Sequence, residues 1–153
     1  MEKKENIKKE IWNLHRKADQ NRTMHGHIKD NYSLFSKIIL GYVSIGSAIV
    51  AMLIFADIKD EAQFWIGIIS ASIFIIGLIP STFSFEGKIT ERGVAVKQWG
   101  AWIRTASNFC NTEIDTLEFE IAQVQAKEII EDYKIIMNET PTIPDRQFNR
   151  LKQ

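Results

Sequence analysis

The sequence predicts an all-α membrane protein built on a hairpin of two transmembrane helices. Two stretches without a charged side chain support this prediction: residues 38–56, with 19 residues, and residues 62–85, with 24. A helix of the first length spans about 28 Å, close to the thickness of a bilayer's hydrocarbon core. Only residues 57–61 separate the stretches. A buried hairpin in a globular core is the alternative, but core helices rarely run this long without charge on any face.

The composition of the whole chain conceals these stretches. The chain has 153 residues with 19 basic and 19 acidic side chains, and its mean hydropathy is slightly negative because polar flanks dilute the apolar blocks. The length predicts one domain, which is expected to be helical over residues 1–138. Pro141, Pro144 and the scattered polar residues around them predict a flexible tail over residues 139–153. The first apolar stretch begins only at Ile38 and has no small-residue cleavage site after a short core, so we do not expect a cleaved signal peptide.

The first predicted element is an amphipathic helix over about residues 3–32. Ile7, Ile11, Leu14 and Ala18 recur at spacings of four, three and four residues, which places them on one face. No proline separates this segment from the first membrane helix. We therefore expect one continuous helix with a cytoplasmic amphipathic part.

Each predicted membrane helix carries a face of small residues. In the first, the candidates for close helix–helix packing are Gly41, Ser44, Ala48 and Ala51. In the second, small and polar residues form a longer stripe: Gln63, Gly67, Ser70, Gly77, Ser81 and Ser84. Two interpretations of this longer stripe stay open. It packs against another helix, with its hydroxyls bonded to the helix backbone, or it lines a water-filled path once several hairpins assemble.

Pro80 is expected to kink the second membrane helix or to mark its inner end. Neither apolar stretch contains an ionisable acid or base. Transporters that couple to protons usually carry such groups inside the membrane, so this class is disfavoured.

The basic residues near the membrane ends predict the orientation. Residues 1–37 carry nine Lys or Arg against five acids, residues 86–105 four against two, and the connection 57–61 one against three. Because basic residues accumulate on the cytoplasmic side, both termini are expected in the cytoplasm. Phe64 and Trp65 would then lie at the outer interface, where aromatic belts form.

Two amphipathic helices are expected after the hairpin. The apolar stripe of the first comprises Val96, Trp99, Ile103, Ala106 and Cys110. Gly93 and Gly100, seven residues apart, share a face that another backbone can approach closely. The second helix should run from about Glu113 to Met137, with Asn111 or Thr112 as its cap. Its expected apolar face is Ile114, Leu117, Ile121 and Val124, continued by Ile129, Ile130 and Tyr133.

The sequence predicts no catalytic residue, metal site or cofactor. It contains no Gly-rich phosphate loop, no H-E-x-x-H and no G-x-S-x-G. The histidines His15, His25 and His27 are expected on the surface, and Cys110 is expected to be a packed thiol. An enzyme would have to assemble scattered groups such as His15, Glu91 and Cys110. The basic residues near tryptophans indicate a membrane surface better than a nucleic acid.

The arrangement resembles the SLATT effector domains of bacteria, in which two closely spaced membrane helices lie between juxtamembrane helical segments. The resemblance rests on HRKADQNRTMHGHIKDNYSLFSK at residues 15–37, which enters the first span, and on FSFEGKITERGVAVKQWGAWIRTASNF at residues 83–109, which leaves the second. It covers most of residues 8–137. It is a likeness of architecture, so no family ligand residue is carried over to this chain.

The resemblance implies a multi-pass effector of the bacterial inner membrane that acts in conflict with phage. Such a protein would oligomerise in the bilayer and permeabilise it when triggered, which arrests growth of the infected cell (abortive infection). Only 68 residues follow Phe85, so we expect the trigger to come from a separate protein, such as a sensor or a nucleotide second-messenger synthetase, or from a ligand that the cytoplasmic helices bind. The alternative is a non-conducting membrane anchor or scaffold that recruits a cytosolic partner through residues 86–137.

Overall fold

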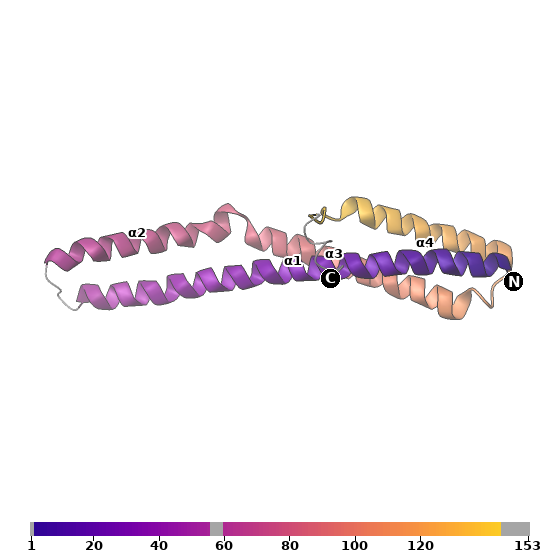
Figure 1. Cartoon of the computed structure of the whole chain (residues 1–153), viewed down its shortest axis with the longest axis horizontal. Coiled ribbons are helices and arrows are strands. Elements are labelled where there is room, and N and C mark those ends of the chain that lie inside the picture. Colours follow the sequence, from indigo (N-terminus) through magenta and orange to yellow (C-terminus); the bar gives the residue numbers. More distant parts are fainter. Residues whose placement is uncertain (1, 56–59, 145–153) are drawn as a thin grey trace. The chain divides into compact units, whose positions relative to one another are not determined.

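The computed structural model describes residues 2–55 and 60–144, which contain helices joined by turns and no strand. The elements are α1 (Glu2–Phe55), α2 (Asp60–Thr82), α3 (Phe85–Asn108), the π-helix η1 (Phe109–Glu113) and α4 (Phe119–Glu139) (Figure 1). This confirms the predicted all-α class, including two apolar helical stretches long enough to cross a bilayer. Most of the predicted connection between the two membrane helices lies outside the described residues.

The helices form two compact units. One unit comprises residues 1–29 and 90–153, and the other comprises residues 30–89. Helices α1 and α3 each contribute residues to both units. We call the unit of residues 1–29 and 90–153 the three-helix unit, and the unit of residues 30–89 the hairpin unit.

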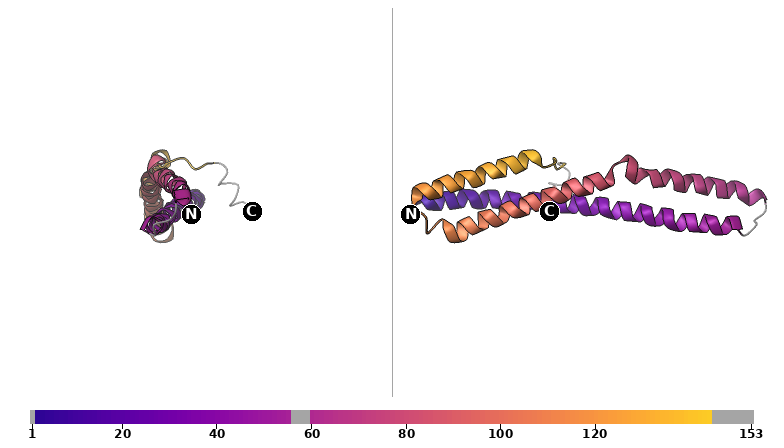
Figure 2. Two further views of the ribbon diagram at one scale, coloured as in Figure 1. Left: turned by 90° about the vertical axis from the view of Figure 1, so that its left-hand side faces the viewer. Right: turned by 180° about the vertical axis from the view of Figure 1, so that it is seen from behind.

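In the three-helix unit, the N-terminal part of α1, most of α3 and α4 lie side by side around one core (Figure 2). The core residues are Ile11, Ala18, Trp99, Trp102, Ile103, Ala106, Phe109, Cys110, Ile114, Ala122, Ala126, Ile129 and Tyr133. The Tyr133 ring lies edge-on to Trp99 and Trp102, with ring centroids 5.2 Å apart in both pairs. Trp102 also donates its buried Nε1–H to the Ile129 carbonyl over 2.8 Å. These contacts join α3 to α4.

Helix α1 runs antiparallel along the predicted glycine face of α3. A Cβ at Gly93 would lie 3.8 Å from the Lys29 Cδ, and a Cβ at Gly100 would lie 3.8 Å from the Arg22 Cδ. Lys29 and Arg22 are seven residues apart, like the two glycines. The glycines therefore leave room for the aliphatic stems of two long basic side chains.

The region after α3 differs from the sequence prediction. Asn111 and Thr112 lie inside η1 and do not cap a helix that starts at Glu113. Instead α4 begins at Phe119, after Glu118 in an extended conformation and without a side-chain cap hydrogen bond. A π-turn holds one more residue than an α-turn. This wider turn keeps three large residues of the region buried: Phe109, Cys110 and Ile114.

The buried face of α4 also differs from the predicted one. The buried residues of α4 are Ala122, Ala126, Ile129 and Tyr133, whereas Ile121 and Val124 are 48% and 57% exposed. Ala122 and Ala126 let α4 approach its neighbours closely, because an alanine occupies so little space. The prediction chose the larger apolar side chains. Ile129 and Tyr133 are buried as predicted, whereas Ile121, Val124 and Ile130 lie outside the core.

The hairpin unit contains the C-terminal part of α1, all of α2 and the first turn of α3. Helix α2 ends at Thr82, two residues after Pro80. The chain then turns through Phe83 and Ser84, and Ser84 has a φ of 50°, the only positive φ of a non-glycine residue in the part of the chain described. The Lys88 N–H donates to the Ser84 carbonyl over 3.0 Å and so starts α3.

Candidate functional site: the apolar helical hairpin

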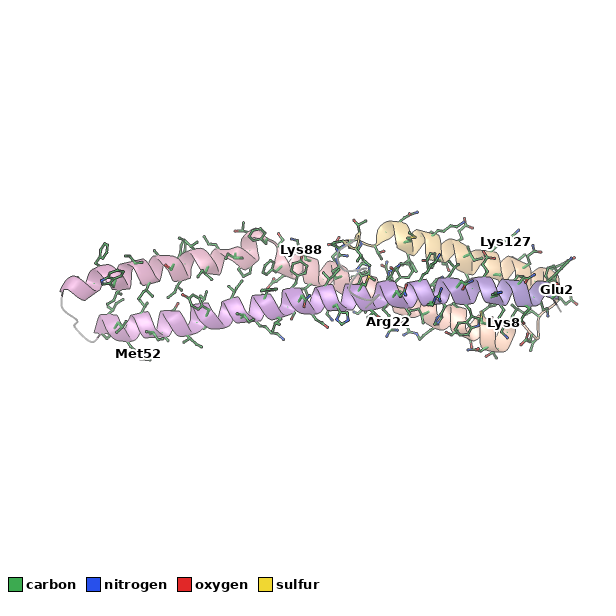
Figure 3. All side chains as sticks on the ribbon, in the orientation of Figure 1. Glu2, Lys8, Arg22, Met52, Lys88 and Lys127 are labelled. Atoms are coloured by element: carbon green, nitrogen blue, oxygen red, sulfur yellow. The ribbon has the colours of Figure 1, made fainter. Side chains whose placement is uncertain are left out.

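The hairpin unit presents its apolar side chains outward. On α1 these include Leu40, Ile45, Met52 and Phe55, and on α2 they include Phe64, Trp65, Phe74 and Ile75, each at least 63% exposed. Met52 points away from α2 in Figure 3. In each of the two apolar windows, only 6% of the residues are buried within the chain. A hairpin in the core of a globular protein would be buried, so the described residues provide no such core around the hairpin.

The two helices of the hairpin touch where a glycine faces a branched side chain. A Cβ at Gly46 would lie 2.7 Å from the Ile73 Cδ1, and a Cβ at Gly77 would lie 3.4 Å from the Val43 Cγ2. Ile73 is the one buried residue among the described residues of this unit. The absence of a side chain at Gly46 therefore permits the closest approach between α1 and α2.

The predicted small-residue face of the first membrane helix lies mostly away from α2. Nothing lies within 4 Å of a Cβ built at Gly41, Ser44 and Ala48 are exposed, and Ala51 borders a groove between the helices. Sequence reasoning missed Gly46. The available signal was its position between Val43 and Val50, which share one face of α1 with it.

The structure divides the predicted stripe of α2 into three pairs. Gln63 and Gly67 are exposed. Ser70 and Gly77 border the groove toward α1, and the Ser70 hydroxyl donates to the Ile66 carbonyl over 2.8 Å. Ser81 and Ser84 border a second groove farther along the chain. One chain therefore does not gather all six residues on a single surface.

Two grooves follow the contact between α1 and α2. The first encloses about 500 Å³ and is lined by Val43, Ser47, Val50, Ala51, Ile54, Ser70, Ile73, Phe74, Gly77 and Leu78. The second encloses about 620 Å³ and is lined by Ser36, Ile39, Leu40, Val43, Gly77, Pro80, Ser81, Ser84, Glu86 and Gly87. Val43 and Gly77 border both grooves. The first is largely apolar, while the second has a polar end.

The prediction that all three histidines lie on the surface was wrong for His25. His25 is 1% exposed, His15 is partly buried with its Nε2 2.9 Å from the Ser107 hydroxyl oxygen, and His27 is exposed. The signal for His25 was its place seven residues after Ala18, which itself follows Ile11 by seven. Residues seven apart share a helix face, so His25 continues the buried face of α1.

Arg92 is the partner of this buried histidine. Its guanidinium lies 3.0 Å from the His25 Nδ1 and donates to the carbonyls of Pro141 and Thr142, both over 3.0 Å. Burial, and then the positive charge of Arg92, lower the pKa of His25 from 6.5 to about 4. His25 is therefore neutral at ordinary pH.

Cys110 is a buried free thiol, as predicted. Burial raises its pKa from 9.0 to about 11, although the positive charge of Lys8 acts in the opposite direction. A thiol with this pKa contains very little of the nucleophilic thiolate at neutral pH.

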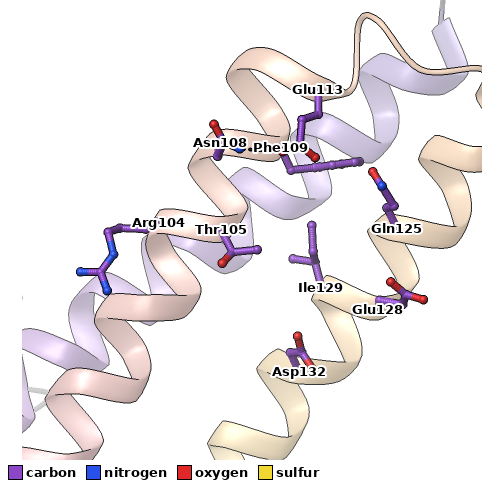
Figure 4. Close-up of a pocket in the computed structure, with 9 residues that line it drawn as sticks. All are labelled: Arg104, Thr105, Asn108, Phe109, Glu113, Gln125, Glu128, Ile129 and Asp132. Atoms are coloured by element: carbon purple, nitrogen blue, oxygen red, sulfur yellow. Dashed lines mark hydrogen bonds between the residues drawn. The ribbon is translucent and has the colours of Figure 1, made fainter.

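A polar cavity of about 460 Å³ lies between α3 and α4 of the three-helix unit (Figure 4). Its lining comprises Arg104, Thr105, Asn108, Phe109, Glu113, Gln125, Glu128, Ile129 and Asp132. Asn108 donates its Nδ2–H to the Glu113 Oε1 over 2.6 Å. Over residues 2–55 and 60–144, no cluster of three or more His, Cys, Asp or Glu side chains is arranged to hold a metal ion.

Comparison of the chain with protein-family models, curated proteins and solved structures found no match. The resemblance to SLATT domains therefore stays a prediction from the arrangement of helices.

Proposed function

We propose that this chain is a membrane effector of antiphage defence that oligomerises in the bacterial inner membrane and permeabilises it when triggered. The outward apolar surface of the hairpin unit is the observation that carries this proposal. Leaving that surface in water is costly, at about 25 cal/mol per Å² of apolar surface. Lipid tails cover it without requiring any hydrogen bond, because the helices satisfy their own backbone groups.

Assembly is required because two helices cannot enclose a pore. Gly41, Ser44 and Ala48 support assembly, since they make no close contact with α2 and leave a smooth face for a neighbouring copy. Gln63 and Gly67 are exposed on α2 and border neither groove, so these members of the α2 stripe are open to a water path between copies.

The proposed trigger acts on the three-helix unit, which has its own core and lies in the cytoplasm under the predicted orientation. A separate sensor, or the product of a nucleotide second-messenger synthetase, would change the packing of this unit and so permit opening. The cytoplasmic placement of both termini rests on the basic residues that flank the hairpin.

The test measures membrane potential with a voltage-sensitive dye in bacteria that express the chain together with its neighbouring genes. The culture is then challenged with phage. Depolarisation before growth arrest supports the proposal. An Ala48→Arg variant places a charge in the first span and should fail to insert, so it serves as the negative control. Insertion of the wild-type chain without depolarisation under challenge contradicts a pore.

The second proposed function is a non-conducting scaffold that recruits a cytosolic partner through residues 86–137. The exposed Ile121 and Val124 of α4 favour it, because such side chains suit a protein partner. A scaffold should keep its full function after residues 38–82 are replaced by an unrelated transmembrane hairpin. A pore should lose its function in that chimera.

A further inference from the structure

The second groove of the hairpin unit has two chemically different halves. Ile39, Leu40, Val43 and Pro80 line the apolar half, whereas Ser36, Ser81, Ser84 and Glu86 line the polar half. The polar half lies at the end of both uncharged stretches, where the chain becomes charged again. An occupant must therefore combine an apolar chain with a polar head.

One basic side chain lies near the polar half. Lys88 follows the lining residue Gly87, and its Nζ lies 5.4 Å from the centroid of the Tyr32 ring. Tyr32 precedes the lining residue Ser36 by one helical turn on the same face of α1. Lys88 carries a positive charge, and the serine hydroxyls of the polar half can donate hydrogen bonds. Negatively charged phosphate oxygens fit both kinds of partner.

One acid borders the same half of the groove. Glu86 is exposed and is a lining residue. Its carboxylate attracts a cation and repels a phosphate, so a purely anionic head would suit the polar half less well than a zwitterion. A head that carries both a phosphate and an ammonium complements Lys88 and Glu86 together.

We propose that this groove binds one phospholipid with an ethanolamine headgroup. An acyl chain lies along Ile39, Val43 and Pro80, the phosphate lies among the serine hydroxyls near Lys88, and the ammonium lies against Glu86. This inference rests on the membrane placement in the proposed function.

The test measures lipid retained by the full chain after reconstitution in vesicles of phosphatidylethanolamine and phosphatidylglycerol in equal amounts. The chain is extracted in mild detergent, and native mass spectrometry counts the bound lipids of each kind. Ser81→Phe fills the groove, while Thr82→Phe places the same ring on an exposed neighbour that does not line it. Glu86→Gln removes the charge expected to hold the ammonium, and Glu91→Gln, on the same helix, is its matched control.

The wild type and Thr82→Phe should retain phosphatidylethanolamine, while Ser81→Phe should retain about tenfold less, the effect expected for losing a hydrogen bond to a charged group. Glu86→Gln should lose the preference for phosphatidylethanolamine over phosphatidylglycerol, and Glu91→Gln should keep it. Equal retention by the two phenylalanine variants, or an unchanged preference in Glu86→Gln, overturns the inference.

Further outcomes separate this inference from the proposed function. A lipid-free dimer that Ser81→Phe disrupts would show that a second copy occupies the groove, and this would overturn only the inference. An inserted chain without bound lipid would also overturn the inference and leave the proposed function standing. A chain that stays outside the vesicle membrane would overturn the proposed function as well.

Discussion

The guanidinium of the half-buried Arg92 lies 3.0 Å from the Nδ1 of the buried His25. Arginine offers only donors and keeps its charge, so the histidine must present an unprotonated Nδ1 as the acceptor. The same guanidinium holds the carbonyls of Pro141 and Thr142. Arg92 thus connects α1 and α3 to the residues that follow α4.

The first prediction concerns pH. The pKa of His25 is lowered from 6.5 to about 4 in the folded chain, so between these values the unfolded chain binds a proton that the folded chain does not. The free energy of unfolding should therefore fall as the pH falls from 7 to 4, by about 3 kcal/mol from this residue. Denaturant unfolding of wild type and His25→Asn at pH 7 and pH 4.5 measures it, since the asparagine keeps an acceptor without titrating. Equal pH dependence in the two proteins would contradict the prediction.

The second prediction concerns Arg92 itself. Arg92→Gln removes a charged donor from His25 and from two carbonyls, so we expect the free energy of unfolding of the three-helix unit to fall by about 2–3 kcal/mol. Thermal unfolding followed by circular dichroism measures the loss. Arg104→Gln is the matched control, because the Arg104 side chain is exposed and makes no hydrogen bond to the described residues. A loss of the same size in both variants would count against a specific role of Arg92.

The third prediction concerns the contact between the membrane helices. Gly46→Val forces its methyl groups into the space of the Ile73 side chain, which lies 2.7 Å from the position of a Cβ. Overpacking of this kind costs about 1–3 kcal/mol. The double variant Gly46→Val with Ile73→Ala should recover most of this loss. Gly41→Val should leave the stability of a single chain unchanged, because nothing within that chain lies within 4 Å of a Cβ there. The free energy of unfolding in detergent micelles checks this ranking of the variants. An unchanged free energy in Gly46→Val would contradict the contact between Gly46 and Ile73.

The fourth prediction concerns the thiol. Cys110 is buried and its pKa is about 11, so a maleimide should label the folded chain slowly at pH 7.5 and the denatured chain fast. In the variant Cys110→Ala with Asn111→Cys the thiol moves to an exposed position, and labelling of the folded chain should be fast. Labelling of native Cys110 at the rate of the denatured chain would be inconsistent with its burial.

The apolar faces of the first and third helices were predictable from the sequence. Ile11 and Ala18 on α1, and Trp99 and Ala106 on α3, are buried as the spacing of three and four residues indicates. The face of α4 was predicted less well, since Ile121 and Val124 are exposed. A helix that carries apolar residues on several sides has more than one apolar face, and the partner helices select among them.

In the hairpin, too, the sequence alone does not identify which of several small residues make the contact between the helices. The sequence contains both Gly41 and Gly46 in the first span, and only the pairing with Ile73 identifies Gly46 as the glycine in close contact. Likewise Gly77 faces Val43, whereas Gly67 on the same helix faces nothing within 4 Å. Small-residue spacing indicates a packing face but does not set the rotation of one helix against another.

By itself, the sequence determined the all-α class, the two uncharged stretches, and the continuity of α1 from its polar to its apolar part. These depend on local properties: the length of an apolar run, the period of a helix and the absence of proline. Only the tertiary structure decided the π-turn before Ile114, the burial of His25 against Arg92, and the role of Gly46 as the glycine that contacts Ile73. Each depends on how closely helices far apart in the sequence approach and how they are rotated, and spacing along one chain does not contain that information.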